Sequence, residues 1–425
     1  MDAIDGSTVL ADVLIPGGRV ADVTISDGVV RHIGASGKAS VRIRCAGLHV
    51  LPAGVDMHVH MRDGLQAYKE DWKTGTHSAL AGGVTVVIDQ PNTLPPLTTV
   101  ESFEQRVRLA AAQSCCHFGI NAGVTPGADI EGMSRAGAMA FGETFAGPSS
   151  FGEAVGRDDL RMLMERITGV NGLITIHAET VREGRDINLA AHHALRAPAG
   201  ETDAIRMVRM LAPAGAHIHF CHISSSDSVR EIRTIPGATS EVTPHHLFLS
   251  LDRLPPYSGF GKVNPPVRTE EERRNLWRHW NEIDVIGSDH APHSVQDKTG
   301  EFSEAPSGIP GIETMIPLFM AQVLKKRITL TDLIRKTSET PARILGIPEA
   351  GFMPGMRGDF ALYPDEPGVV RSEDLHSKAG WTPFEGMEAV FPVMVVLGGA
   401  VAFDQDHVTF TTPEWMKGRG YKQSV

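Results

Sequence analysis

The sequence is poor in the features that mark secreted, disulfide-bonded or membrane-spanning proteins. Only four of its 425 residues are cysteine, and none of them has the C-x-x-C spacing of a redox or metal motif. Cys115 and Cys116 are adjacent, which is a poor arrangement for a disulfide, so we expect reduced thiols. The first residues lack the basic start and apolar stretch of a signal peptide, and no apolar run could span a bilayer. We therefore expect a cytoplasmic protein without a membrane partner.

Positive charge is also scarce, since 40 Lys and Arg residues face 51 Asp and Glu residues and the formal net charge is -11. A protein that binds along a phosphate backbone needs clustered lysines and arginines, so we expect no nucleic-acid partner. An anionic small-molecule substrate is still compatible with this charge, because the local charge of a cleft can oppose the global sign. The composition, with 41% hydrophobic and 21% charged residues, is otherwise typical of a globular protein.

Short apolar runs alternate with helix-forming stretches between residues 52 and 347. The eight runs are Gly54–His58, Val84–Asp89, Cys116–Ile120, Ala138–Phe141, Leu173–His177, His217–His222, Thr239–Thr243 and Asp284–Asp289. This alternation predicts an α/β fold, a (β/α)8 TIM-like barrel over residues 52–347. A doubly wound open sheet is the alternative. The barrel is favoured because polar residues recur at the C-terminal ends of the runs, where barrel enzymes place their sites.

Both ends of the chain are rich in strand-forming residues. The predicted strands are Val9–Ile15, Ala21–Ile25, Val29–Ile33, Gly358–Tyr363 and part of Met394–Val401. Asp27 and Gly28 stand between two of them and predict a hairpin turn. We expect residues 1–51 and 348–425 to build one small β-sandwich domain, with a C-terminal tail, into which the barrel is inserted.

Histidines and a carboxylate stand at the ends of several predicted strands. His58 and His60 are two residues apart, so in an extended strand both imidazoles face the same side and can bind one metal ion. His177, His222 and Asp289 end the fifth, sixth and eighth runs. Imidazole and carboxylate are the ligands that a zinc-type ion prefers when it keeps a position open for water. Four strands that deliver such groups at one end predict a metal site.

These motifs together resemble the amidohydrolase superfamily and, within it, the dihydroorotase group of cyclic amidohydrolases. The segments that carry the resemblance are Leu51–Arg62, Gln90–Thr93, Ile176–Glu179, Val242–Leu247, Lys262–Arg268, Ser288–His293, Gly308–Thr314 and Ser377–Phe384. The resemblance covers nearly the whole chain. It implies the reversible cyclisation of N-carbamoyl-L-aspartate to L-dihydroorotate in pyrimidine biosynthesis.

The resemblance also implies a role for each strand-end residue. His58, His60 and Asp289 would hold one Zn²⁺ ion, and His177 and His222 a second. Two ions can share a hydroxide and lower the pKa of water, while one polarises the carbonyl under attack. Asp289 would be the general acid and base, because it can take the proton of the nucleophile and return it to the leaving nitrogen.

Arg62 is the best predictor of the substrate. A guanidinium beside the metal suits a carboxylate, which dihydroorotate carries and which hydantoin and allantoin do not present there. The resemblance adds further substrate-binding candidates: Asn92, Asn264, His293, and the backbone near Ser307 and Gly308. The alternatives are a structural salt bridge for Arg62 and a turn-forming role for the two asparagines.

The fourth predicted strand departs from the pattern of the superfamily. Many members with two metal ions carry a carboxylated lysine there that bridges the ions, but residues 138–145 contain no lysine. Glu143 is the matching candidate, because its carboxylate offers the same two oxygens on a shorter arm. We therefore expect one or two zinc ions, with Glu143 as a metal ligand in place of the modified lysine.

Two other functions are compatible with these motifs. One is a sister enzyme, such as a hydantoinase or an allantoinase, against which Arg62 and Asn92 argue. The other is a catalytically inactive homologue that serves as a structural partner of aspartate carbamoyltransferase, against which the retained metal ligands argue. We expect a homodimer or homotetramer, and association with aspartate carbamoyltransferase is a further prediction.

Several other features are predicted to be structural. His245 and His246 have no evident chemical role, and His192 and His193 lie in an Ala-rich helical stretch where we expect a helix surface. Residues 300–310 and 64–70 are the candidates for a loop that closes over the substrate.

Overall fold

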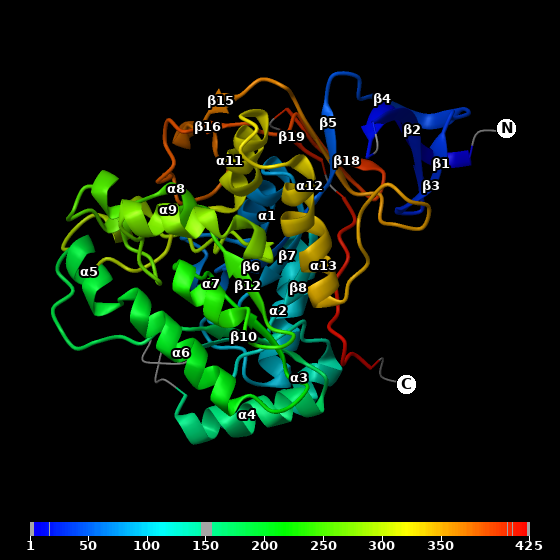
Figure 1. Ribbon diagram of the computed structural model, residues 1–425. Helices are drawn as coiled ribbons and strands as arrows, with labels where there is room; N and C mark the ends of the chain where they lie inside the picture. The colour runs from blue at the N-terminus through cyan, green and yellow to red at the C-terminus, as the bar shows by residue number, and fades with distance from the viewer. Residues whose placement is uncertain (1–3, 17, 146–154, 406, 410, 423–425) are drawn as a thin grey trace.

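The computed structural model describes residues 4–16, 18–145, 155–405, 407–409 and 411–422 (Figure 1). Its centre is a ring of eight parallel strands: β6 (Gly54–Val59), β7 (Val84–Asp89), β8 (His117–Ile120), β9 (Phe141–Phe145), β10 (Leu173–His177), β11 (His217–Phe220), β12 (Thr239–Val242) and β13 (Val285–Ile286). Parallel bridges between Ala122 and Phe141 and between Val59 and His290 join a three-stranded and a five-stranded sheet into this ring. The predicted TIM barrel is confirmed.

The fourth strand begins later than predicted. The backbone of Ala138–Phe141 was expected to form it, but β9 runs from Phe141 to Phe145. The N–H of Met139 already donates to the carbonyl of Ile120 in β8 at 2.8 Å, yet pairing with β10 starts only at Phe141. The pairing partner therefore sets the start of this strand, and Glu143 lies inside the strand.

Helices surround the barrel (Figure 1). They are α1 (Trp72–Ala81), α2 (Val100–Gln113), α3 (Ile130–Ala136), α4 (Arg157–Gly169), α5 (Leu189–Leu195), α6 (Pro198–Leu211), α7 (Ser226–Ile232), α8 (Pro244–Phe248), α9 (Glu270–Arg278), α10 (Val295–Lys298), α11 (Ile312–Leu324), α12 (Leu330–Ile334) and α13 (Thr340–Leu345). Side-chain caps set several of their starts. Asp71 accepts a hydrogen bond from the N–H of Thr74 at 2.8 Å, and Thr99 and Thr269 form capping boxes. No helix in the described part of the chain combines the length and apolar character that a bilayer crossing requires.

The two chain ends form two further sheets. The first has the order β3 (Val29–Gly34), β2 (Arg19–Ser26), β1 (Ile4–Ile15), β4 (Ala39–Arg44), and the second β19 (His407–Val408), β18 (Ala400–Asp404), β17 (Met394–Leu397), β14 (Phe360–Tyr363), β5 (His49–Pro52). Two short strands, β15 (Gly368–Val369) and β16 (Glu388–Ala389), pair separately. Asp27 and Gly28 have φ of 51° and 76°, so the predicted hairpin turn is present.

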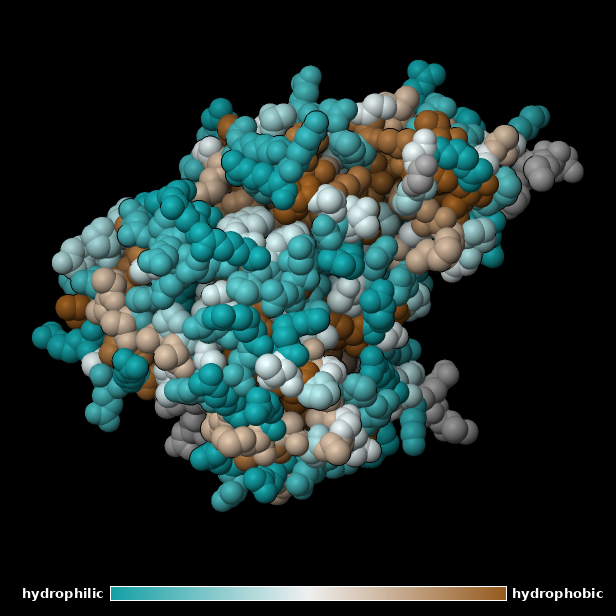
Figure 2. All heavy atoms as spheres, viewed as in Figure 1, coloured by the Kyte–Doolittle hydropathy of each residue, from teal (hydrophilic) through white to brown (hydrophobic). Residues whose placement is uncertain are grey.

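The two terminal sheets share one hydrophobic core. Buried side chains of β1 and β2, such as Leu10 and Val23, cluster with Phe360, Leu362 and Val396 from the other end of the chain. In Figure 1 the blue strands and the red β18 lie near each other at the upper right. The same region carries hydrophobic surface in Figure 2, and Leu14 and Val20 are 57% and 61% exposed.

Candidate metal and substrate site

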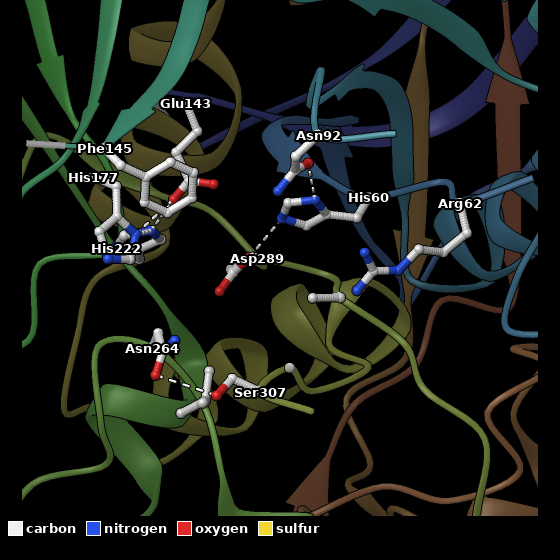
Figure 3. A pocket seen from close by; sticks show the side chains of 13 residues that line it. His60, Arg62, Asn92, Glu143, Phe145, His177, His222, Asn264, Asp289 and Ser307 are labelled. Carbon is white, nitrogen blue, oxygen red and sulfur yellow. Dashed lines mark hydrogen bonds and ion pairs between the residues drawn. The ribbon is translucent and has the colours of Figure 1, made fainter. Parts of the chain in front are cut away.

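The six predicted metal ligands lie together at the C-terminal ends of five barrel strands. They are His58 and His60 at the end of β6, Glu143 in β9, His177 at the end of β10, His222 after β11 and Asp289 after β13. Each exposes less than a tenth of its surface. In Figure 3, Glu143, His177 and His222 lie on one side of Asp289, and His60 with Asn92 lies on the other.

The first group of ligand atoms surrounds Asp289. Its Oδ1 lies 3.5 Å from Nε2 of His58 and 3.2 Å from Nε2 of His60. The opposite nitrogens of these rings donate outward, Nδ1 of His58 to Glu241 at 2.9 Å and Nδ1 of His60 to Asn92 at 2.8 Å. Because both acceptors are oxygens, Nδ1 of each ring is the donor in these bonds, and Nε2 is the nitrogen that faces Asp289. This orientation is typical of metal-binding histidines.

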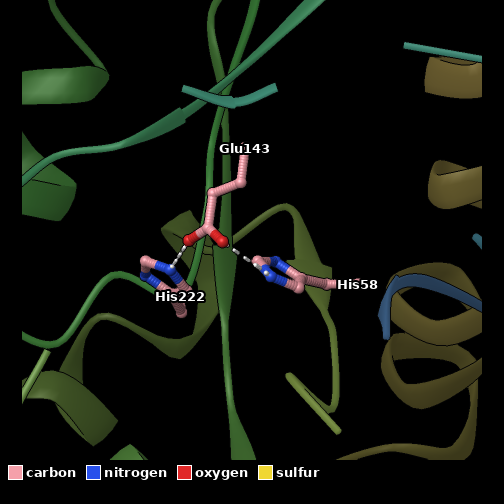
Figure 4. A group of neighbouring side chains, drawn as sticks. All are labelled: His58, Glu143 and His222. Atoms are coloured by element: carbon pink, nitrogen blue, oxygen red, sulfur yellow. Dashed lines mark hydrogen bonds and ion pairs between the residues drawn. The ribbon is translucent and has the colours of Figure 1, made fainter. Parts of the chain in front are cut away.

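The second group is centred on Glu143 (Figure 4). Its Oε1 lies 2.9 Å from Nδ1 of His177 and 2.5 Å from Nε2 of His222, while its Oε2 faces Nε2 of His58 at 3.7 Å. Nε2 of His177 points away, toward Glu179 at 3.4 Å. The two oxygens of one carboxylate therefore face different sets of histidines, as the oxygens of a bridging ligand do.

These residues fit divalent metal ions. Among the described residues, neither Nε2 of His58 nor Nδ1 of His222 has a hydrogen-bond partner, although both atoms are buried. A buried nitrogen without a hydrogen-bond partner destabilises the folded state. A metal ion would remove this cost for Nε2 of His58, which faces the site. The ligand atoms of His58, His60 and Asp289 lie within 4.8 Å of one another, as do those of His58, Glu143 and His222. A mixed nitrogen and carboxylate set suits zinc.

The electrostatics keep the two carboxylates ionised. Burial raises the pKa of Glu143, but the imidazoles of His222 and His58 outweigh it and hold the pKa well below its usual value. Burial also raises the pKa of Asp289, but the hydrogen bond from His60 and the charge of His58 outweigh it, so the pKa is lowered. Burial lowers the pKa of His58, yet Glu241 and other nearby groups raise it well above 6.5.

The backbone is strained at three of the site residues. Arg62, His222 and Asp289 have φ of 50°, 35° and 44°, in the left-handed region that favours glycine. Each such residue costs about 1–3 kcal/mol and persists only where the surroundings hold it. The N–H of His222 donates to the buried carboxylate of Glu241 at 3.1 Å, and this hydrogen bond stabilises the strained backbone at His222.

All the predicted site residues except His58 and His293 line one cavity, whose remaining walls are Phe145, Val263 and Ala291. Arg62 is 3% exposed and, among the described residues, has no ion-pair partner, so a structural salt bridge is not its role. Burial lowers its pKa to about 10, which leaves the guanidinium charged at neutral pH.

Three of the other substrate candidates, Asn264, Ser307 and His293, are linked to one another on the far side of the cavity. The hydroxyl of Ser307 donates to Oδ1 of Asn264 at 3.2 Å, and Nε2 of His293 donates to the carbonyl of Ser307 at 3.1 Å. His293 lies behind the cavity wall, where Nη2 of Arg62 approaches it at 3.2 Å. Its hydrogen bond to the Ser307 carbonyl supports the cavity wall.

Two residues near the site were missed or misread from the sequence. Glu241 in β12 is fully buried and accepts hydrogen bonds from His58 and from the N–H of His222. A lone acid within a predicted barrel strand was the available signal, since buried glutamates are nearly always paired. The prediction that His192 lies on a helix surface is wrong. It is 1% exposed and contacts the carbonyl of Val263 at 3.0 Å, so it supports the Asn264 loop.

The chain is similar to known proteins over most of its length. The profile of the Amidohydrolase family matches residues 49–401. Dihydroorotases of Methanosarcina acetivorans and Halobacterium salinarum are 37% and 35% identical, covering 95% and 94% of this chain and 93% and 97% of their own lengths. The L-hydantoinase (dihydropyrimidinase) of Arthrobacter aurescens superimposes with a TM-score of 0.90 at 27% identity, over 96% of this chain and 99% of that one.

Proposed function

The chain belongs to the amidohydrolase family, and from this membership we propose that it acts as a dihydroorotase, interconverting N-carbamoyl-L-aspartate and L-dihydroorotate. The observation that carries the proposal is Arg62, a buried guanidinium that lines the cavity beside Asp289 without an ion-pair partner among the described residues. A substrate carboxylate would complete that pair. The dihydroorotases that match nearly the full length of the chain support the same reading.

We propose that His58, His60 and Asp289 hold one zinc ion and that His177 and His222 hold a second, with Glu143 between them. When bound, such ions lower the pKa of water and polarise the amide carbonyl under attack. Asp289 is ionised at neutral pH, so it can accept the proton of the nucleophile and deliver it to the ring nitrogen as the C–N bond breaks. Ring closure uses the same proton transfers in reverse.

The remaining side chains would hold the substrate in position. Arg62 binds the carboxylate through two parallel hydrogen bonds. Oδ1 of Asn92 is engaged by His60, which leaves its amide nitrogen to donate to the substrate. Asn264 and the backbone of Ser307 and Gly308 face the ring from the other side of the cavity.

The domain division and the assembly are part of the same proposal. The core shared by the two terminal sheets supports a small β-sandwich domain built from residues 1–51 and 348–425, around a barrel of residues 52–347. Exposed Leu14 and Val20 on the first of these sheets support contact with a second copy of the chain. We propose a homodimer or homotetramer in the cytoplasm. Association with aspartate carbamoyltransferase stays a prediction.

Substrate choice tests the proposed function. Zinc-loaded protein is expected to turn over L-dihydroorotate and not hydantoin or allantoin. Arg62→Met should raise KM for dihydroorotate about 10–100-fold, the loss expected for a hydrogen bond to a charged group. The alternative, a hydantoinase, is favoured by the Arthrobacter aurescens structure. Turnover of hydantoin with none of dihydroorotate would establish that alternative and overturn ours.

A further inference from the structure

Lys298, the last residue of α10, is a buried cation close to the substrate side of the cavity. It is 1% exposed, and its ammonium donates to the main-chain carbonyls of Lys262 at 3.0 Å, Pro306 at 2.8 Å and Gly308 at 2.9 Å. An ammonium has three N–H donors, so all three are used. A neutral amine could donate to only two of these carbonyls.

This charge is held without a carboxylate. None of the described residues forms an ion pair with Lys298, and the face of the Trp381 ring lies 5.6 Å from its nitrogen. Burial and the nearby charge of Lys262 hold the pKa of Lys298 well below its usual value, against the opposing effect of Asp297. Packing alone does not account for this residue, since an apolar side chain would fill the space without the desolvation cost.

The three carbonyls belong to two loops that line the cavity opposite the metal ligands. Lys262 precedes Asn264 by two residues, and Pro306 and Gly308 flank Ser307. The N–H of Gly308 also donates to the carbonyl of Lys262 at 3.0 Å. In Figure 3, Asn264 and Ser307 lie side by side, joined by their hydrogen bond. Lys298 therefore forms hydrogen bonds to both loops and holds them together.

The same lysine is connected to the Arg62 side of the cavity. The indole N–H of Trp381, whose ring faces Lys298, donates to the carbonyl of His293 at 2.8 Å. His293 in turn contacts Ser307 and Arg62. Loss of the ammonium would therefore free the Ser307 loop, which forms part of the cavity wall.

We propose that Lys298 is a positioning residue for substrate binding. Its ammonium binds the main-chain carbonyls as a bound cation would. It thereby holds the Asn264 loop and the Ser307–Gly308 loop in the conformation that accepts the substrate ring. The identity of that ring rests on the proposed function, whereas the fastening of the loops does not. Because the loops contact the ground state and the transition state alike, their release should weaken binding more than chemistry.

The test compares Lys298→Met with Lys336→Met. Lys336 is also fully buried, donates to a main-chain carbonyl, that of Ile283, and lies 5.0 Å from a tryptophan ring. Ile283 precedes β13, so this control lysine is at the opposite end of the strand from Asp289. Lys298→Met should raise KM for dihydroorotate at least about tenfold, with kcat within about threefold and zinc content unchanged. Lys336→Met should leave KM within about threefold.

Amide hydrogen exchange provides a readout that does not depend on activity. Exchange at residues 262–264 and 306–309 should accelerate in Lys298→Met and not in Lys336→Met. If the wild-type protein does not turn over dihydroorotate, the proposed function is wrong. The exchange comparison still tests the role of Lys298 in that case. Wild-type KM together with wild-type exchange in Lys298→Met would overturn the proposal, as would a fall in kcat alone.

Two further variants cover the case in which Lys298→Met does not fold. Lys298→Arg keeps the charge and the donors, and Lys298→Gln keeps donors without the charge. We expect the arginine variant to retain a lower KM and slower exchange than the glutamine variant. The reverse order would contradict the proposal.

Discussion

At the scale of single residues, Glu143 lies between the two groups of candidate metal ligands. One of its oxygens is within hydrogen-bond distance of His177 and His222, and the other faces His58. Glu143→Gln keeps the size of the side chain and removes its charge. If the carboxylate bridges two ions, this change should lower bound zinc from about two ions per chain to about one and reduce turnover at least about 100-fold. Metal analysis after dialysis and initial rates measure both effects.

A surface glutamate supplies the control for this experiment. Glu131 pairs with Arg166 at 2.5 Å on the outside of the barrel, so Glu131→Gln should keep both zinc and rate. Full zinc content and full rate in Glu143→Gln would show that the bridging assignment is wrong.

At the scale of elements, the C-terminal segment extends the sheet at β8. The N–H of Phe118 donates to the carbonyl of Glu414 at 3.1 Å, and the N–H of Met416 donates back to Phe118 at 2.7 Å. His117 fastens the same segment, because its Nδ1 accepts a hydrogen bond from the N–H of Glu414 at 2.8 Å. That bond requires an unprotonated Nδ1, so acid should release the segment.

The pH dependence of stability follows from His117. Burial lowers its pKa from 6.5 to about 4, with the charge of Arg357 adding to the effect and Asp359 opposing it. Above pH 6.5 neither the folded nor the unfolded state is protonated at this site. Below it the unfolded state gains the proton first, so this histidine should cost about 3 kcal/mol of stability as the pH falls from 6.5 to about 4.

Comparison with a variant isolates this contribution from other titrating groups. His117→Gln keeps an acceptor but does not titrate, so the difference in unfolding free energy between wild type and variant should shrink from pH 7 to pH 4. Urea denaturation at several pH values measures it. A difference that stays constant with pH would refute the assignment.

Strand four illustrates why element boundaries are hard to predict. Residues 138–141 and 141–145 are both apolar enough to form a strand, and local pattern does not separate them. The pairing of Phe141 with Ile174 of β10 decides the boundary. That pairing is a long-range contact, which no short window of sequence contains.

At the scale of the whole molecule, the candidate metal ligands come from five strands around the barrel, so bound zinc would tie distant segments together. Removing zinc with a chelator should lower the unfolding temperature, and restoring it should recover the loss. At free zinc about a thousandfold above Kd, the stabilisation is about 4 kcal/mol per site. Scanning calorimetry with and without zinc measures the shift. His60→Asn should show a smaller shift, and an unfolding temperature indifferent to zinc would contradict the site.

The barrel and the metal-ligand candidates were accessible from the sequence because their signals are local. The alternation of apolar runs with helical stretches predicts parallel strands, and such strands present their C-terminal ends at one face. His58, His60, His177, His222 and Asp289 each stand at a run end, so their convergence follows from the fold class alone. The family resemblance then suggested Glu143.

The contacts that hold those groups in place depend on the folded chain. His58 and Glu241 are 183 positions apart in the chain, and Lys298 reaches carbonyls of two separate loops. Orienting an imidazole or fastening a loop requires an atom within about 3 Å, and closure of the barrel selects that atom. The residue types at the strand ends already define which chemistry the site can offer. The folded chain determined that Glu241 is the buried partner of His58 and Lys298 that of the two loops, because such partners are selected by their distance in space.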